Sequence, residues 1–229
     1  MSGICGLWLP SGEPVAAGVL ERMAAPLEVR APEGTGVWRQ GEVGLGHTLL
    51  ATTPELVFER QPWRHGETGC AIVADVRLDN RDDLIRALGL AQRYRAIGDA
   101  ELIVHAWLAW GEACPERLLG DFAFALFDPR QRTLLLARDH TGMRPLYYHH
   151  QPGQQVVFAS EARAVLASGR VAKRINEGRI ADFLVTQLEG DKFSTFFEGI
   201  YRLAPALRLV VTPDSARLER YWRPEAQDV

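Results

Sequence analysis

Two apolar hairpins near the middle of the sequence constrain the fold more than any other feature. Residues 122–127 read Phe-Ala-Phe-Ala-Leu-Phe, residues 128–131 are typical of a turn, and residues 133–137 return as a second apolar run. The same pattern recurs in residues 146–150 and 155–159. Because strands joined by a short turn run antiparallel, the sequence predicts an α+β fold. Its antiparallel sheets would be covered by helices, unlike an alternating parallel α/β fold.

The other expected elements are short strands and short helices. Strands are expected in residues 3–10, 45–50, 71–74 and 207–211, and helices in residues 15–23, 79–88, 100–110, 114–119, 160–166 and 180–184. Pro26 is expected to stop the first helix. Asp79-Asn80 and Ser160 are predicted caps, because short polar side chains accept hydrogen bonds from the first helical turn. Residues 54–69 are expected to form a loop.

Composition limits the class of protein. At 229 residues the chain can bury a substantial core, as one large domain or two small ones. The net charge of −3 and the dispersed basic residues predict neither nucleic acid nor a membrane as partner. Cys5, Cys70 and Cys114 are far apart, which argues against disulfides and a metal site. We find no leader pattern and no apolar stretch long enough for a bilayer, so a cytoplasmic protein with reduced thiols is expected.

Several strings occur in an order that resembles one family. They are Val29-Arg30-Ala31-Pro32-Glu33-Gly34, Leu45-Gly46-His47, Leu78-Asp79-Asn80-Arg81, Gly98-Asp99-Ala100-Glu101, Leu119-Gly120-Asp121-Phe122, residues 137–148 and Phe158-Ala159-Ser160-Glu161. Each is a weak signal alone, but together they span nearly the whole chain. The sequence thus resembles the class II glutamine amidotransferase domain of asparagine synthetase-like enzymes. The resemblance implies the N-terminal-nucleophile hydrolase fold, a four-layer αββα sandwich of two antiparallel sheets.

The first six residues, Met1-Ser2-Gly3-Ile4-Cys5-Gly6, resemble the opening Cys-Gly-Ile-x-Gly strand of that family. In the family, removal of Met makes the cysteine a nucleophile whose own α-amine is the base. Ser2 occupies this catalytic position, which is therefore degenerate. Ser2 is either a serine nucleophile, as in other hydrolases of this fold, or a small residue that begins a strand without reacting. The second interpretation is favoured, because an alcohol is a far weaker nucleophile than a thiol.

Three further positions of the family's glutamine pocket are substituted. Leu49 stands where the resemblance places an arginine that binds the α-carboxylate of glutamine. Asp75 replaces an asparagine that stabilises the oxyanion, and an ionised carboxylate can only accept hydrogen bonds. Arg77 replaces a glutamate that helps to bind the substrate ammonium. The alternative for Asp75 and Arg77 is a structural ion pair with each other on one strand face.

Asp99 is the pocket position that keeps the family's residue, a partner of the substrate α-amine. It also begins a predicted helix, and helix capping is the favoured interpretation of its carboxylate. His47 and His65 are interpreted as structural, with His47 in packing. Arg138, Asp139 and Glu161 are interpreted as internal hydrogen-bonded scaffold or as contacts to a partner domain.

The family's synthetase half is absent from this sequence, because no Ser-Gly-Gly-x-Asp-Ser pyrophosphate loop occurs. We expect no cofactor or metal in this chain, and ATP and Mg on a synthetase domain outside it. Residues 1–212 are expected to form the amidotransferase-like domain, and residues 213–229 the segment that leads to the synthetase domain. That domain would belong to the same longer chain or to a separate subunit, and a homodimer is also compatible with the sequence.

The substitutions favour a degenerate amidotransferase-like domain without glutaminase activity, acting as structural partner of an ATP-dependent amide-forming domain. The strings around Leu49 and Asp75 resemble lasso-peptide cyclases and, more broadly, β-lactam synthetase-like members. That resemblance implies a peptide or a small amino-acid derivative as substrate of the whole enzyme. One alternative is an active glutaminase domain of a glutamine-hydrolysing asparagine synthetase, with Ser2 as nucleophile. Another is a free-standing interaction module.

Overall fold

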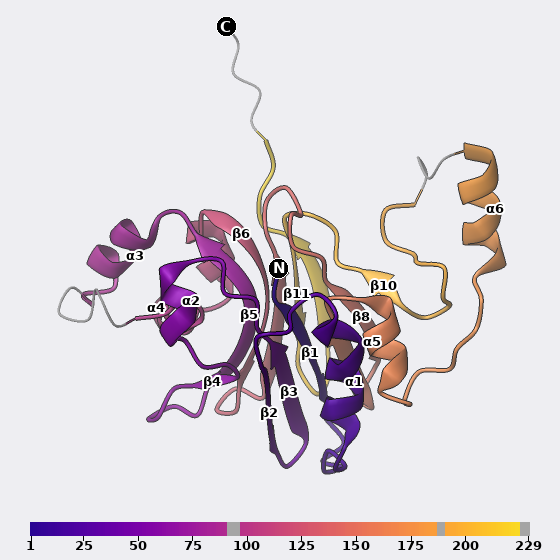
Figure 1. The fold of residues 1–229 in the computed structure, drawn as a ribbon, viewed down its shortest axis with the longest axis horizontal. Coiled ribbons are helices and arrows are strands. Elements are labelled where there is room, and N and C mark those ends of the chain that lie inside the picture. Colours follow the sequence, from indigo (N-terminus) through magenta and orange to yellow (C-terminus); the bar gives the residue numbers. More distant parts are fainter. Residues whose placement is uncertain (91–96, 187–190, 225–229) are drawn as a thin grey trace, which may run out of the picture.

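The computed structural model describes residues 1–90, 97–186 and 191–224, which form two six-stranded sheets (Figure 1). The first sheet has the order β10-β8-β9-β1-β3-β2, and the second the order β12-β11-β7-β6-β5-β4. The described strands pair antiparallel throughout both sheets. Both hairpins predicted from the sequence are confirmed, one in each sheet.

The elements have the following bounds. The first sheet contains β1 (Gly3–Trp8), β2 (Thr35–Gln40), β3 (Val43–Thr48), β8 (Tyr147–Gln151), β9 (Gln155–Ala159) and β10 (Tyr201–Arg202). The second contains β4 (Trp63–Arg64), β5 (Ala71–Leu78), β6 (Gly120–Asp128), β7 (Thr133–Arg138), β11 (Leu207–Val211) and β12 (Ala216–Arg220). The helices are α1 (Val19–Glu28), α2 (Pro54–Phe58), α3 (Arg81–Ala87), α4 (Asp99–Trp110), the 3₁₀-helix η2 (Gly111–Arg117), α5 (Ala162–Ala167) and α6 (Glu177–Thr186).

Three apolar clusters divide the molecule into layers. Successive side chains of a strand point to opposite faces, so β6 contributes Phe122 and Phe124 to the cluster under α3 and α4, and Ala123 and Ala125 to the cluster between the sheets. A third cluster packs α1 and α5 on the outer face of the first sheet. The predicted four-layer αββα sandwich is therefore confirmed, with its largest apolar surfaces buried in the three spaces between layers.

Several local predictions are wrong in detail. Helix α1 continues through Pro26 to Glu28, because a proline in the last turn removes only one helical hydrogen bond. Residues 54–58, expected in a loop, form helix α2. Ser160 does not cap α5. Its hydroxyl accepts the N–H of Ile4 at 2.9 Å, which ties the start of β1 to the end of β9.

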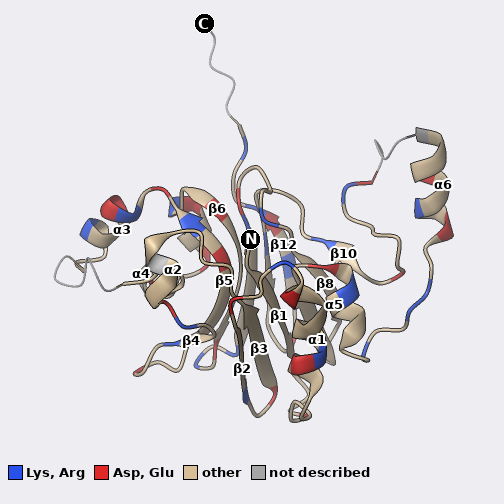
Figure 2. Cartoon of the chain, viewed as in Figure 1, with Lys and Arg blue, Asp and Glu red and all other residues tan. Residues whose placement is uncertain are grey.

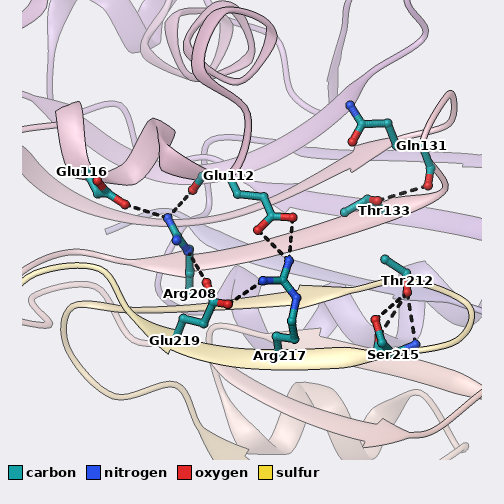
Figure 3. Close-up of polar contacts among 9 residues, drawn as sticks. All are labelled: Glu112, Glu116, Gln131, Thr133, Arg208, Thr212, Ser215, Arg217 and Glu219. Atoms are coloured by element: carbon teal, nitrogen blue, oxygen red, sulfur yellow. Dashed lines mark hydrogen bonds and ion pairs between the residues drawn. The ribbon is translucent and has the colours of Figure 1, made fainter.

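The C-terminal hairpin of β11 and β12 is fastened to η2 by charges (Figure 3). Arg208 lies 2.9 Å from Glu116 and 3.0 Å from Glu219, and Arg217 lies 2.7 Å from Glu112. Residues 213–229 are predicted from the sequence only to lead to the synthetase domain. Strand β12 lies within them, so part of this segment forms an edge strand of the second sheet. The division at residue 212 stays a prediction. In the described part of the chain, no helix has the length and apolar character needed to cross a membrane.

A buried polar cluster organises the turn that follows β7. The Asp139 carboxylate is fully buried and accepts the N–H groups of Phe122, Thr141, Met143 and Arg144. Four donors on one carboxylate fix both the end of β6 and the course of the turn.

The neighbouring Arg138 completes this cluster. It donates to the carbonyls of Gly142, Arg144 and Leu203. Gly142 has φ +74°, and a Cβ there would stand 2.6 Å from Pro205 and 3.0 Å from Arg138. Only glycine fits this turn without strain. The interpretation of Arg138 and Asp139 as internal scaffold agrees with these contacts.

Replacing Asp139 by alanine should destabilise the protein by at least about 3 kcal/mol, because it leaves buried N–H groups without an acceptor. Urea unfolding measures the effect. The matched control is Asp214→Asn, an exposed acidic residue in the β11–β12 turn, which should change stability by less than about 0.5 kcal/mol. Equal small effects of the two substitutions would show that the cluster does not hold the turn.

Candidate functional site

Ser2 lies at the start of β1 and is buried, with 2 % of its surface exposed. Its hydroxyl accepts the N–H of Leu50 at 3.1 Å and lies 3.4 Å from the Leu50 carbonyl, to which it donates. A general base must lie within hydrogen-bond reach of the nucleophile's proton. Here the hydroxyl is bonded to the backbone on both its donor and acceptor sides, so Ser2 links β1 to the end of β3.

Asp75 lies on β5. Among the charged side chains, it has the largest electrostatic effect on the α-amine of Met1. It is 3 % exposed and lies 3.7 Å from both Arg30 and Arg144. Burial raises the pKa of the Asp75 carboxyl above its usual value, and the two arginines offset part of that rise. Burial also lowers the pKa of the α-amine of Met1, against the attraction of Asp75. No pattern in the sequence indicated that Arg30 and Arg144 would lie beside Asp75.

Asp75 and Arg77 both take part in ion pairs within the protein, as the structural alternative expects, but they do not pair with each other. Arg77 is half-exposed and lies 3.1 Å from Asp79 and 3.6 Å from Asp121. The register of β5 and β6 places Asp121 directly opposite Arg77. Each residue therefore has its own partners: Arg77 pairs with Asp79 and Asp121, and Asp75 with Arg30 and Arg144.

Asp99 begins α4 and is 2 % exposed. Its carboxylate accepts the N–H of Leu78 at 2.9 Å and forms an ion pair with Arg81. Arg81 is fixed in turn by the carbonyl of Ile97, 2.7 Å away. The family resemblance implies that the Asp99 carboxylate binds the α-amine of the substrate. In this structure the carboxylate instead binds Arg81 of the same chain.

The predicted capping role of Asp99 is wrong. The cap of α4 is Gly98, and the N–H of Ala100 donates to the carboxylate of Glu59 at 2.8 Å. A Cβ on Gly98 would stand 2.6 Å from the Glu59 side chain, so the glycine admits this distant carboxylate. Sequence reasoning missed Glu59 because it lies in a segment expected to be loop, far from the helix that it caps.

Leu49 lines a cavity of about 300 Å³, and neither Ser2 nor Asp99 lines it. Its walls are formed by Glu33, Gly34, Thr35, Gly36, His47, Leu49, Glu59, Arg60 and Gln61. Burial raises the pKa of Glu59 to about 7, despite the helix N–H groups that favour its ionised form. Burial lowers the pKa of His47 to about 4, so its imidazole is neutral at pH 7.

The remaining candidates have structural surroundings. The three cysteines are free and buried, and burial raises the pKa of the Cys5 thiol to about 12, so it is not a reactive thiolate. His65 contacts Thr68 at 3.0 Å, and its ring packs against Trp63. Glu161 lies 3.4 Å from Arg30 and also contacts Arg163. Within the described residues, no group of three or more potential ligands could hold a metal ion.

Two facing antiparallel sheets between helical layers, with the chain's first residues opening a central strand, define an N-terminal-nucleophile hydrolase fold of the amidotransferase type. The chain belongs to the glutamine amidotransferase domain family, whose model matches residues 1–222. Among solved structures, glutamine phosphoribosylpyrophosphate amidotransferase from B. subtilis superposes with a TM-score of 0.66 at 19% identity. The superposition covers 97% of this chain and 50% of that one.

Curated relatives confirm the resemblance to asparagine synthetases. Asparagine synthetase [glutamine-hydrolyzing] 3 of Bacillus subtilis is 30% identical over 91% of this chain and 34% of its own length. A putative asparagine synthetase of Methanocaldococcus jannaschii is 24% identical over 100% of this chain and 47% of its own length. Amidase chry2 of Gibberella zeae is 28% identical over 92% of this chain and 31% of its own. The chain thus spans a third to a half of the length of these relatives.

Replacing Arg81 by methionine should destabilise the protein by about 3–5 kcal/mol, because Asp99 would be left as a buried charge without its partner. The matched control is Arg77→Met, which removes half-exposed ion pairs in the same region and should cost less than about 1 kcal/mol. Thermal and urea unfolding of both variants check the difference. Similar losses would contradict the assignment of Arg81 as the internal counter-ion.

Proposed function

We propose that this chain is a degenerate glutamine amidotransferase domain without glutaminase activity, and that it serves as structural partner of an ATP-dependent amide-forming domain. One observation carries the proposal. At the positions where the family resemblance places glutamine contacts, the polar side chains are bound to partners within the protein, and the carboxylate anchor is a leucine. A ligand would have to displace those internal partners to bind.

The residue type and the hydrogen bonds of the nucleophile position both argue against reaction. The Ser2 hydroxyl is buried and bonded to the Leu50 backbone, and an alcohol is a poor nucleophile unless a base removes its proton. Asp75, opposite the terminus, is an acceptor when ionised and would repel a developing oxyanion. Loss of one oxyanion donor typically lowers the rate by about 10²–10³.

Leu49 and Asp99 stand at the two positions where the family resemblance implies contacts to the carboxylate and the α-amine of glutamine. Neither is free to make its contact in this structure. Leu49 cannot pair with a carboxylate, and truncation of such a buried charge pair costs about 2–5 kcal/mol. Asp99 could still bind an ammonium group, but Arg81 already supplies its cation. Binding of glutamine would therefore need a buried ion pair to break before a new one could form.

The partner is inferred from α6 and from the length of the relatives. In Figure 1, α6 stands away from the body of the molecule, and Figure 2 shows its charged residues toward its start, before the apolar residues near its end. Phe183, Leu184 and Val185 are 50 %, 74 % and 80 % exposed. Nearby Phe193 and Phe196 are also exposed. An apolar patch of this kind marks an interaction site, and the additional length of the relatives supplies a candidate partner domain.

We assign to that partner domain the ATP and Mg of the assembled enzyme. Its reaction would be of the peptide-maturation or lactam-forming type, since the chain keeps the amidotransferase framework while its glutamine contacts are replaced. The alternative is an active glutaminase domain with Ser2 as N-terminal nucleophile. The name of the B. subtilis relative, a glutamine-hydrolysing asparagine synthetase, favours this second candidate.

Incubation with glutamine should release no ammonia above the uncatalysed rate, and the glutamine analogue 6-diazo-5-oxo-L-norleucine should leave the protein mass unchanged. Ser2→Cys should not restore activity, because Leu49, Asp75 and Arg81 remain. Ammonia release and intact-mass spectrometry measure both results. An adduct on Ser2 of the unsubstituted protein, together with ammonia release, would establish the glutaminase alternative instead.

Replacing Phe183 and Leu184 together by serine should weaken the complex with the ATP-dependent domain, supplied as a separate chain, by at least about tenfold in Kd. The fold should be unchanged, because both side chains are exposed on α6. Val29→Ser, which alters an exposed apolar residue after α1, is the control. Calorimetric titration measures the affinities; an unchanged Kd would show that α6 lies outside the interface, and no measurable binding by the unsubstituted chain would favour a free-standing module.

A further inference from the structure

A second cavity, with a volume of about 380 Å³, lies at the end of the sheets remote from Ser2. Residues of β2, the β2–β3 turn, β4 and the β6–β7 turn contribute to its lining. In the register of β1 and β3, Gly3 pairs with Thr48 and Trp8 with Val43. The length of β1 therefore separates the cavity, at Val43, from the N-terminal site by about 16 Å. In Figure 1 the β2–β3 turn accordingly lies at the bottom of the view, away from the end marked N.

Part of the lining is apolar. Trp38 and Val43 contribute to it from the first sheet, and Phe127 and Pro129 from β6 and the turn after it. Val43 and Phe127 belong to the buried cluster between the sheets, and Trp38 packs against that cluster while remaining partly exposed. Ligand pockets are typically lined by such side chains with a few polar groups, and range from about 300 to about 1,000 Å³. The volume of this cavity fits one aromatic ring with a short substituent.

Arg64, on β4, supplies a cation to the same lining. Its guanidinium carbon lies 5.1 Å from the centroid of the Trp38 ring, within the range of a cation–π contact. The side chain is exposed, and no carboxylate of the described residues forms an ion pair with it. A guanidinium that stacks on a ring uses its face, so the N–H groups at its edge can still donate in pairs to a carboxylate.

The other charged residues of the lining pair with each other. The Arg132 Nη2 atom lies 3.0 and 2.9 Å from the two carboxylate oxygens of Glu42, and it also donates to the carbonyl of Pro10 at 3.0 Å. This ion pair joins the β6–β7 turn of the second sheet to the β2–β3 turn of the first. Since the two charges neutralise each other, the charge preference of the cavity depends on Arg64.

We propose that this cavity binds a small aromatic carboxylate. The ring packs against Trp38, Val43 and Phe127, and the carboxylate accepts two hydrogen bonds from the edge of the Arg64 guanidinium. An aliphatic anion lacks the ring that fills the apolar part of the cavity, and an aromatic cation meets a like charge. The inference goes beyond the proposed function and does not depend on it, because the cavity is separate from the N-terminal site.

Phenylacetate tests the proposal, with 2-phenylethylammonium as a ring of opposite charge and acetate as a carboxylate without a ring. Each is titrated into the full chain labelled with ¹⁵N. Phenylacetate should shift the Trp38 indole N–H and the Arg64 amide in a saturable way, and the two comparison ligands should bind at least about tenfold more weakly. Raising NaCl from about 0.05 M to about 0.5 M should weaken phenylacetate binding, because salt screens an exposed charge pair.

Arg64→Gln should weaken phenylacetate binding at least about fivefold, because a neutral amide cannot form two charge-assisted hydrogen bonds. Arg64→Lys keeps the charge and loses the paired donors, so its affinity should be intermediate. The matched control is Arg39→Gln, which removes an exposed arginine next to Trp38 on β2, on the opposite strand face. It should change the affinity less than about twofold.

Absence of saturable shifts with phenylacetate would overturn the inference, and so would equal binding of either comparison ligand. Equal losses of affinity in Arg64→Gln and Arg39→Gln would also overturn it, because net charge and not the stacked guanidinium would then attract the anion. The proposed loss of glutaminase activity is measured separately, by ammonia release, and is unaffected by these outcomes.

Discussion

The carboxylate of Asp139 gathers four backbone N–H groups at the end of β7. Arg138 binds three carbonyls of the same region, and its own carbonyl accepts the hydroxyl of Tyr221. These bonds join the second sheet, the turn after β7 and the C-terminal segment. They also fix the backbone of Arg144, whose side chain reaches Asp75. The electrostatics of the candidate site thus depend on a polar cluster built into the framework.

The polar side chains of the candidate site form ion pairs or hydrogen bonds with other residues of this chain. Arg30 and Arg144 surround Asp75, Arg81 binds Asp99, and the Leu50 backbone binds Ser2. Partners from other segments of the chain thus hold these side chains. The hydrogen bonding is incomplete, because one buried atom each of Asp75, Arg30, Arg144, Glu59 and His47 has no hydrogen-bond partner.

The sequence predicted the fold well, because the hairpins at residues 122–137 and 146–159 are local and their apolar alternation reflects which sheet face each residue covers. The substituted positions were also visible, since each stands inside a recognisable string. Their partners were not visible. The contact of Glu59 with α4 and that of Arg144 with Asp75 join residues far apart in sequence, and no periodicity encodes such tertiary contacts.

The ion pair between Arg81 and Asp99 has a consequence for which substitutions this chain can tolerate. A substitution that frees Asp99 for a substrate first exposes a buried charge to an apolar surrounding, and stability falls before any binding is gained. The same holds for Asp75 and its two arginines. A single substitution at either carboxylate's partner would therefore lower stability, and only a paired change that supplies a new counter-ion would avoid that loss.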